Sequence, residues 1–286
     1  MRLTRAFVWV LFKALNIYGG FTAIYKVLTG AQLYSVRTLT QTVESMDAAL
    51  KAIKEMGYTS VQLSGQSRDI DPVAIKDMLD KYGLIAPSTH ISFEELENDF
   101  DKAVARHKLW GVPYPGIGGM PGEFRASAEA LKEFARRANI IGKKLKDEGM
   151  TFVYHNHAFE FARYGVKNGM DILFDELTDV QFELDVYWVQ SGGADPIEWI
   201  KKVAGRMDVV HFKEMVGCVP DEKNHSMTKM APVGEGNFDW QKIMQTCDDT
   251  GVKFAFIEQD NAVDTDPLCC MKTSINNLTR LGGRFK

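Results

Sequence analysis

The sequence lacks three features that would each have indicated a class of protein. No uninterrupted apolar run approaches the roughly 20 residues that span a bilayer, so we expect no stable membrane span. No block of Lys or Arg is present and the formal net charge is −4, which argues against nucleic acid as a partner. The four cysteines lack CxxC spacing, so neither a thiolate zinc site nor a disulfide framework is indicated. A reducing compartment, the cytoplasm, fits best.

The first 30 residues differ from the rest of the chain. Residues 1–5 are basic, residues 6–12 are apolar, and Lys13 interrupts the run. A basic start followed by a short apolar stretch is typical of a signal segment, but only residues 29–31 offer a weak cleavage pattern. The extension is therefore a leader, an interfacial anchor or a helix packed on the domain, and a true signal would make the protein exported.

From residue 33 onward, segments with helical periodicity alternate with short β-rich runs. The first such helix carries Val43, Met46, Leu50 and Ile53 on one face and stops at Gly57, before the β-rich run 60–63. Glycine suits this position because it takes the left-handed conformation that ends a helix. The same helix-to-strand junction recurs at glycines 57, 83, 111, 149, 205 and 251. Strands predicted at 32–37 and 181–186 bring the number of strands to eight.

Alternating strands and helices require parallel strand pairing with right-handed crossovers. Eight such units in 286 residues favour a closed barrel over an open sheet, and no GxGxxG follows the first strand, which argues against a dinucleotide fold. We therefore predict a single (β/α)8 TIM barrel of the α/β class over residues 31–286, with residues 1–30 as an N-terminal extension.

Titratable residues arrive at the same height on several of these strands. His90, His155, His211 and Glu258 each follow a junction glycine by six or seven residues, and Asp185 ends its own strand. In a (β/α)8 barrel this height is the C-terminal face, where active sites lie. The sequence therefore predicts that these five side chains meet there.

Each of these residues also has an ordinary structural explanation. Asp185 could cap the next helix, Glu258 could pair with Lys213, and single histidines at strand ends are often only hydrogen-bonded. Together, however, buried carboxylates and imidazoles need compensation, and one divalent metal ion is the simplest source. Carboxylate and imidazole ligands without thiolate suit Mn²⁺, Co²⁺, Zn²⁺ or Fe²⁺.

An ordered set of motifs in residues 31–286 resembles the sugar phosphate isomerase/epimerase family of the xylose isomerase-like barrels. The motifs are QLYSVR at 32–37, YHNHAFEF at 154–161, LDVYW at 184–188, HFKE at 211–214, VGEGNFDW at 233–240 and IEQD at 257–260. The resemblance implies a metal held by Asp185, His211 and Glu258. His155 stands where many relatives carry a catalytic Glu, and it is the candidate for a fourth metal ligand because imidazole is a competent ligand. Trp188 stands where some relatives have a substrate-binding His.

The resemblance implies an isomerase or epimerase that acts on a keto-sugar or related polyol through an enediolate. Glu258 is the expected proton-transfer residue, with His155 or His157 as its partner and Lys213 as a further catalytic candidate. The residues expected to contact substrate are His157, His90, Glu160, Trp188 and Lys213, followed by Gln62 and Tyr34. Loss of a hydroxyl after deprotonation would instead make the protein a dehydratase, as in the related inosose dehydratases.

Other interpretations stay open at this stage. The superfamily also contains endonucleases, but only six histidines and an acidic pI near 5.9 argue against one here. A non-catalytic sugar-binding barrel is a further alternative, and a homo-oligomer is compatible with the sequence. We expect His107 and His225 to lie on the surface and Glu235 to lie on a mobile loop near the site. The pattern does not say whether the carbohydrate is phosphorylated.

Overall fold

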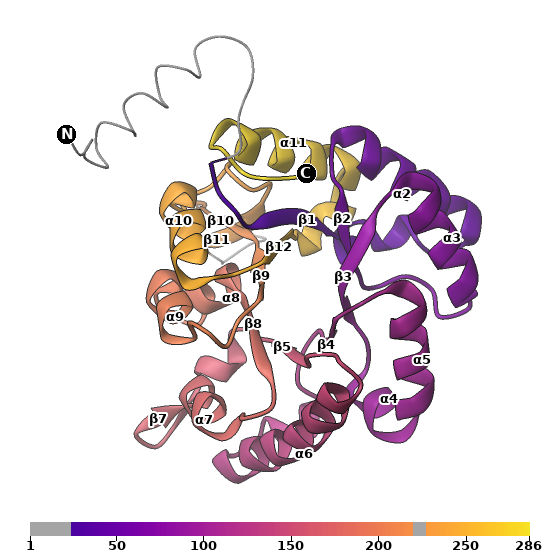
Figure 1. The fold of residues 1–286 in the computed structure, drawn as a ribbon. Coiled ribbons are helices and arrows are strands. Elements are labelled where there is room, and N and C mark those ends of the chain that lie inside the picture. The colour runs from indigo at the N-terminus through magenta and orange to yellow at the C-terminus, as the bar shows by residue number, and fades with distance from the viewer. Residues whose placement is uncertain (1–23, 220–226) are drawn as a thin grey trace, which may run out of the picture.

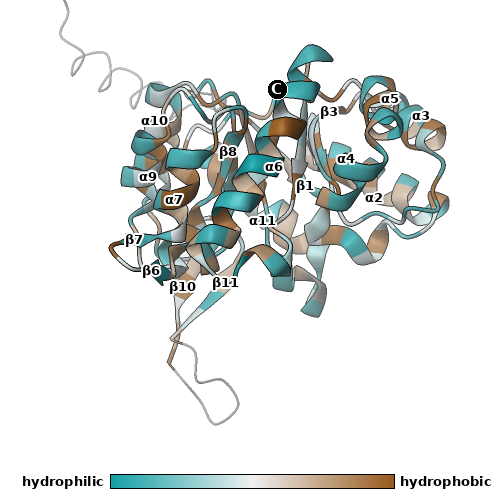
Figure 2. Cartoon of the chain, turned by 90° about the horizontal axis from the view of Figure 1, so that it is seen from below, coloured by the Kyte–Doolittle hydropathy of each residue, from teal (hydrophilic) through white to brown (hydrophobic). Residues whose placement is uncertain are grey.

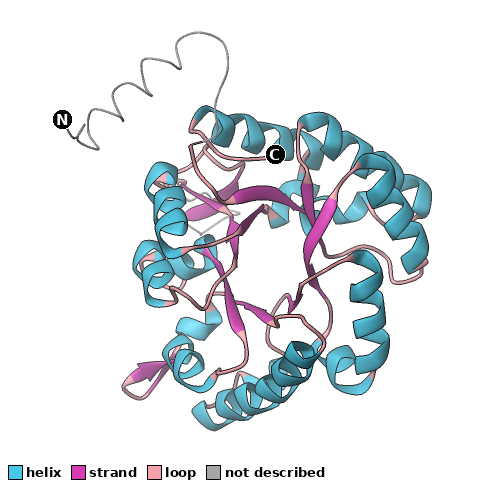
Figure 3. Ribbon diagram, viewed as in Figure 1, coloured by secondary structure: helices cyan, strands magenta, loops and turns pink. Residues whose placement is uncertain are grey.

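Eight parallel strands close into a barrel in the computed structural model, which describes residues 24–219 and 227–286. The strands form the inner ring and the helices an outer ring (Figures 1 and 3). The barrel strands are β1 (Leu28–Gln32), β2 (Ser60–Leu63), β3 (Ile85–His90), β4 (Tyr114–Ile117), β5 (Val153–His155), β8 (Gln181–Asp185), β9 (Val209–Phe212) and β12 (Phe254–Ile257). Their order around the barrel is β1-β12-β9-β8-β5-β4-β3-β2. The prediction of a single (β/α)8 barrel is confirmed.

The first strand lies earlier than the sequence pattern predicted. β1 ends at Gln32, and the segment predicted as strand forms the 3-10 helix η1 (Leu33–Leu39) instead. The Gln32 side chain accepts a hydrogen bond from the Tyr34 N–H at 3.1 Å and thereby turns the chain out of the sheet. The small residues of β1 have weak strand propensity, so the sequence pattern did not indicate a strand there. A glycine is needed at position 30 because a Cβ there would lie 2.4 Å from Ser60 Oγ on the neighbouring strand. Residues 28–30, assigned to the extension, thus lie within a barrel strand.

The outer ring contains helices after most barrel strands. They are α2 (Val43–Met56), α3 (Pro72–Tyr82), α4 (Phe93–Asn98), α5 (Phe100–Trp110), α6 (Ala128–Asp147), α7 (Gly169–Glu176), α8 (Val186–Ser191), α9 (Pro196–Lys202), α10 (Trp240–Thr250) and α11 (Pro267–Arg280). All six junction glycines have positive φ, between 57° at Gly83 and 112° at Gly57. The left-handed glycine conformation that the sequence predicted at the helix-to-strand junctions is therefore confirmed. None of the helices in the described ranges is long and apolar enough to cross a membrane.

Two short β-hairpins follow the C-terminal ends of two barrel strands. The hairpin β6 (Arg163–Tyr164) and β7 (Lys167–Asn168) follows β5, and the hairpin β10 (Glu214–Gly217) and β11 (Thr228–Ala231) follows β9. Both hairpins project on the same side of the barrel (Figure 2). The remaining 3-10 helices are η2 (Gly122–Phe124), η3 (Phe159–Phe161) and η4 (Asp260–Asp264). These additions surround the strand ends where the candidate site lies.

The inside of the barrel is apolar near one end and polar near the other. Tyr114, Val153, Val209 and Phe256 form a small buried cluster inside the ring, separate from the main core between strands and helices. Side chains two positions further along the same strands point inward as well, because side chains alternate along a strand. The apolar cluster therefore forms a floor, and the polar residues at the strand ends stand above it.

Candidate metal centre

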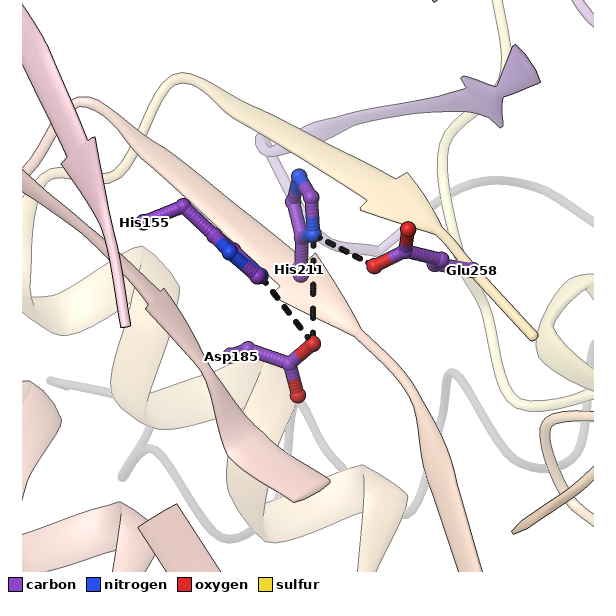
Figure 4. A group of neighbouring side chains, drawn as sticks. All are labelled: His155, Asp185, His211 and Glu258. Carbon is purple, nitrogen blue, oxygen red and sulfur yellow. Dashed lines mark hydrogen bonds and ion pairs between the residues drawn. The ribbon is translucent and has the colours of Figure 1, made fainter. Parts of the chain in front are cut away.

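Four side chains from neighbouring strands converge above this floor. His155 ends β5, Asp185 ends β8, His211 lies in β9 and Glu258 directly follows β12. One ligand atom from each lies within 4.8 Å of the others (Figure 4). All four residues are buried, with exposed fractions of 4% or less. The structure thus brings together the four residues that the sequence suggested as metal ligands.

Asp185 has two roles that the sequence left as alternatives. Its Oδ1 accepts hydrogen bonds from the backbone N–H groups of Tyr187 at 2.9 Å and Trp188 at 3.2 Å, and so caps α8. Its Oδ2 faces the cluster, 3.3 Å from His155 Nε2 and 3.9 Å from His211 Nδ1. The cap therefore fixes the carboxylate while leaving one oxygen for the site.

Both imidazoles are held through the nitrogen that faces away from the cluster. His155 Nδ1 donates to the Gly118 carbonyl at 3.1 Å, which leaves Nε2 toward Asp185. His211 Nε2 donates to Gln62 Oε1 at 2.6 Å, which leaves Nδ1 2.8 Å from Glu258 Oε2. Histidines that bind metals are oriented in this way by a second hydrogen bond.

A buried polar layer below the cluster contains Glu183, a carboxylate that the sequence pattern did not single out. Glu183 lies two residues before Asp185 on β8 and is fully buried. It accepts hydrogen bonds from His90 Nε2 and from Gln62 Nε2, each at 2.6 Å. Burial alone would raise its pKa, but His211 and His90 together lower it more, so the carboxylate stays charged. The alternation of side chains, two positions before Asp185, is the signal that could have found it.

The ammonium group of Lys213 lies among the carboxylates of the cluster. Its Nζ lies 2.9 Å from Asp185 Oδ2, 2.8 Å from Glu258 Oε2 and 3.1 Å from Asp260 Oδ1. Burial opposes the charge, but the three carboxylates raise the pKa of the ammonium well above its ordinary value. Lys213 lies two residues after His211, so the alternation of side chains directs it into the barrel as well. Because Lys213 already offsets part of the carboxylate charge, charge compensation alone does not require a metal. The orientation of the two imidazoles is the feature that favours one.

The three histidines of the site differ in their protonation. Burial lowers the pKa of His155, and it also lowers the pKa of His157 to about 3. Burial opposes protonation of His211 as well, but Glu183 and Glu258 outweigh it and raise its pKa to about 10. Without a metal, His211 is therefore an imidazolium with an acceptor at each nitrogen. A cation at Nδ1 would replace that proton.

A cavity of about 270 Å³ opens above the four side chains. It is lined by Tyr34, Ser64, His90, Gly118, His155, His157, Lys213, Glu258 and Asp260. Near it, His157 Nδ1 and Trp188 Nε1 are buried without a hydrogen-bond partner in the described part of the chain. The two rings lie 5.3 Å apart, and Lys213 Nζ lies 5.2 Å from the Trp188 ring. Buried polar atoms without a partner are rare in folded proteins, so a bound molecule with hydroxyl groups could pair with these two.

Glu160, which the sequence suggested as a substrate contact, lies outside the lining of this cavity. Glu160 is fully buried, accepts from Tyr154 Oη at 2.6 Å and from the His157 N–H at 2.9 Å, and does not line the cavity. Its pKa is raised by burial to about 8. Its contacts brace the β5 loop, so the structure gives no support to substrate contact.

His107, predicted on the surface, and Glu235, predicted on a mobile loop near the site, both lie elsewhere. His107 is buried, not on the surface, because its ring lies 2.7 Å from Thr89 Oγ1 and donates to the Ala103 carbonyl at 2.6 Å. Glu235 is exposed and bonded to Asn277 Nδ2 at 2.7 Å on α11, not to the site. His225 and residues 1–23 lie outside the described residues.

The donor set fits a divalent cation. Two carboxylates and two imidazoles converge within one small space. Both rings are turned so that a nitrogen faces this space, and His211 Nδ1 offers its lone pair once a cation displaces its proton. A (β/α)8 barrel with such a cluster at the C-terminal ends of its strands has the architecture of an enzyme. Fold and site together therefore define a (β/α)8 barrel with a candidate metal centre at the C-terminal ends of its strands.

Comparison with known proteins places the chain within a family. A family model described as xylose isomerase-like TIM barrel matches residues 50–267, well over half of the chain. The protein belongs to the xylose isomerase-like TIM barrel family. This family membership agrees with the resemblance carried by the sequence motifs.

Curated relatives of the chain are inosose dehydratases. The one from Clostridium perfringens is 28% identical over 157 residues, which cover 50% of this chain and 52% of the relative. The one from Geobacillus kaustophilus is 26% identical over 200 residues, covering 60% and 62%. The matches thus span only about half to three fifths of the relatives' length.

Solved structures match the fold over almost the whole chain. A sugar phosphate isomerase/epimerase from Parabacteroides distasonis has a TM-score of 0.72 at 23% identity, covering 91% of this chain and 96% of that one. A probable 3-DHS dehydratase from Bacillus anthracis has a TM-score of 0.67 at 16% identity, covering 88% and 98%. At these identities the likeness concerns the fold alone.

Proposed function

We propose that the protein is a divalent-metal-dependent isomerase or epimerase of a keto-sugar or related polyol that works through an enediolate. The observation that carries the proposal is the convergence of His155, Asp185, His211 and Glu258, with each imidazole anchored through its outer nitrogen. A divalent cation held by these side chains would supply a Lewis acid that stabilises negative charge on a chelated carbonyl and its neighbouring hydroxyl.

Glu258 and Lys213 are the side chains that we propose to take part in proton transfer. Glu258 is the leading base because its carboxylate reaches the cavity and is held ionised, since Lys213 and His211 outweigh the effect of burial and lower its pKa. The Lys213 ammonium, 2.8 Å from Glu258, is placed to donate to an oxygen of the enediolate. His157 lines the cavity and Trp188 packs beside His157, and each carries a buried polar atom without a partner in the described residues that a substrate hydroxyl could pair with. Return of the proton to the other face gives epimerisation, and return to the next carbon gives isomerisation.

Dehydration of a keto-polyol is the second candidate, and one observation favours it. His155 replaces the strand-five carboxylate of many related epimerases, and its two nitrogens are committed to Gly118 and to the cluster. The site then lacks a matched base opposite Glu258 in the described residues, whereas Lys213 could protonate a departing hydroxyl. The inosose dehydratases among its relatives agree with this alternative.

The first experiment combines metal analysis with proton exchange. Purified protein is analysed for Mn, Co, Zn and Fe, and then keto-sugars, keto-polyols and their phosphates are incubated with it in deuterated water. We expect a bound divalent metal and metal-dependent exchange of the proton next to a carbonyl, detected by NMR. Absence of both a metal and any exchange would overturn the enzyme proposal. Formation of an unsaturated product with loss of water would select dehydration over isomerisation.

A Glu258→Gln variant tests the proposed base. Glutamine keeps the shape and can still accept from Lys213, but it cannot take up a proton, so exchange should fall by at least about 100-fold, as general-base loss typically does. Circular dichroism and thermal unfolding should match the wild type closely enough to exclude misfolding. Wild-type exchange in this variant would remove Glu258 from the mechanism.

A further inference from the structure

A second cavity of about 260 Å³ adjoins the candidate active site. His90 lines both cavities, and Ser64 of the first is followed in the chain by Gly65 of the second. The second cavity is built from the loops after β2 and β3, closed by Arg106 and Trp110 of α5. The two cavities are therefore neighbours that share His90 as a common wall.

Two of the residues that line this cavity each carry a buried side-chain atom without a hydrogen-bond partner in the described ranges. Within the described ranges, neither Gln66 Oε1 nor Arg106 Nε has a hydrogen-bond partner. One is an acceptor and the other a donor. A buried polar group left unpaired costs free energy, which a ligand recovers by pairing with it. A hydroxyl group both donates and accepts, so it suits this pair of atoms.

One of the two arginines that line the cavity is already paired with a carboxylate. Arg106 forms a salt bridge with Glu95 at 2.6 Å, and its guanidinium lies 5.3 Å from the centre of the Trp110 ring. The charge of Arg106 is thus offset, and the unpaired Gln66 oxygen would repel a phosphate. Arg68 adds a positive charge only on an exposed residue of the lining.

We propose that the substrate carries a second, uncharged hydroxyl-bearing unit that binds in this cavity, as a keto-disaccharide would. This inference rests on the proposed keto-sugar chemistry of the neighbouring site. Each cavity alone lies just below the roughly 300–1,000 Å³ typical of small-molecule sites, whereas the two together fall within that range. The first cavity holds the reacting keto-sugar, and the second selects a neutral sugar ring over a phosphate.

Binding and turnover are measured separately with defined probes. D-Fructose and D-fructose 6-phosphate are compared with turanose, maltulose, lactulose and isomaltulose, which attach a second sugar to fructose through different linkages. Affinities are measured by calorimetry on the metal-loaded protein, and exchange in deuterated water is followed by NMR. We expect at least one disaccharide to bind tenfold or more tightly than fructose, and the phosphate to show no such gain.

Two variants test the unpaired atoms. Gln66→Leu removes the acceptor, and Arg106→Lys removes the Nε donor while keeping a charge for Glu95. Each should weaken the disaccharide by about five- to tenfold, the usual effect of one hydrogen bond, and leave fructose unchanged. Gln245→Leu, on the exposed face of α10, is the matched control and should change neither.

The outcomes separate this inference from the proposed function. Exchange on fructose with no preference for any disaccharide would overturn the second subsite and leave the proposed chemistry intact. Disaccharide binding that depends on Gln66, without proton exchange, would support the subsite and overturn the proposed reaction. Tighter binding of the phosphate than of every disaccharide, or an unchanged disaccharide affinity in Gln66→Leu, would also overturn the subsite.

Discussion

Replacement of Gln62 by methionine should weaken metal binding without touching a proposed ligand. Gln62 is fully buried on β2, and its Oε1 accepts from His211 Nε2 at 2.6 Å. Its Nε2 donates to Glu183 at 2.6 Å and to Ser88 at 2.9 Å. Methionine is unbranched and of similar length, so packing should change little while all of these hydrogen bonds are lost.

The expected loss of metal affinity depends on which hydrogen-bond acceptors remain around His211 in this variant. Loss of a partner that orients a metal-binding histidine typically lowers metal affinity 10–100-fold, or about 1.4–2.7 kcal/mol. Glu183 Oε1 lies 3.4 Å from the same His211 nitrogen and can replace Gln62 as the acceptor. We therefore expect a loss near tenfold. The metal-free protein should also unfold more easily, because Glu183 loses a donor at a cost of roughly 1–3 kcal/mol.

Calorimetric titration of metal-free protein with Mn²⁺ or Zn²⁺ measures the affinity, and urea unfolding measures the stability. Gln181→Leu is a suitable control because Gln181 begins strand β8 at the opposite end of the barrel and bonds to Asp208 there. An unchanged affinity in the Gln62→Met variant would show that this hydrogen bond does not orient His211 for a metal. Equal losses in Gln62→Met and the control would point to a general effect on the fold.

Two further predictions concern pH. The pKa of His211 is raised to about 10, so a cation that binds its Nδ1 must displace a proton. Metal affinity should therefore fall about tenfold for each unit that the pH drops. Equal affinities by calorimetry at about pH 8 and about pH 6 would contradict this prediction. Burial lowers the pKa of His107 to about 4, below the roughly 6.5 of an unfolded chain, so this residue stabilises the fold above pH 6.5 and its contribution is lost toward pH 4. That loss is about 3 kcal/mol in urea unfolding, and a His107→Gln variant should show a shallower pH dependence; identical slopes would refute the assignment.

Much of the barrel could be predicted from local sequence chemistry. Each junction glycine marks a helix end whose geometry depends on only a few neighbouring residues, so Gly57 and Gly251 have the left-handed conformation that their spacing indicated. The first strand was misplaced because Gly30 and its small neighbours have weak strand propensity, and close packing against Ser60 makes them a strand. That contact exists only once the barrel has formed.

The sequence by itself determined that His155, Asp185, His211 and Glu258 would stand at one height, because strand length and alternation fix where each side chain leaves its strand. Tertiary structure alone decided what surrounds them. Gln62 reaches Glu183 across 121 positions of sequence, and Lys213 enters the cluster between carboxylates from different strands. Such partners depend on barrel closure and on which side chains face inward together, and no local pattern encodes those distances.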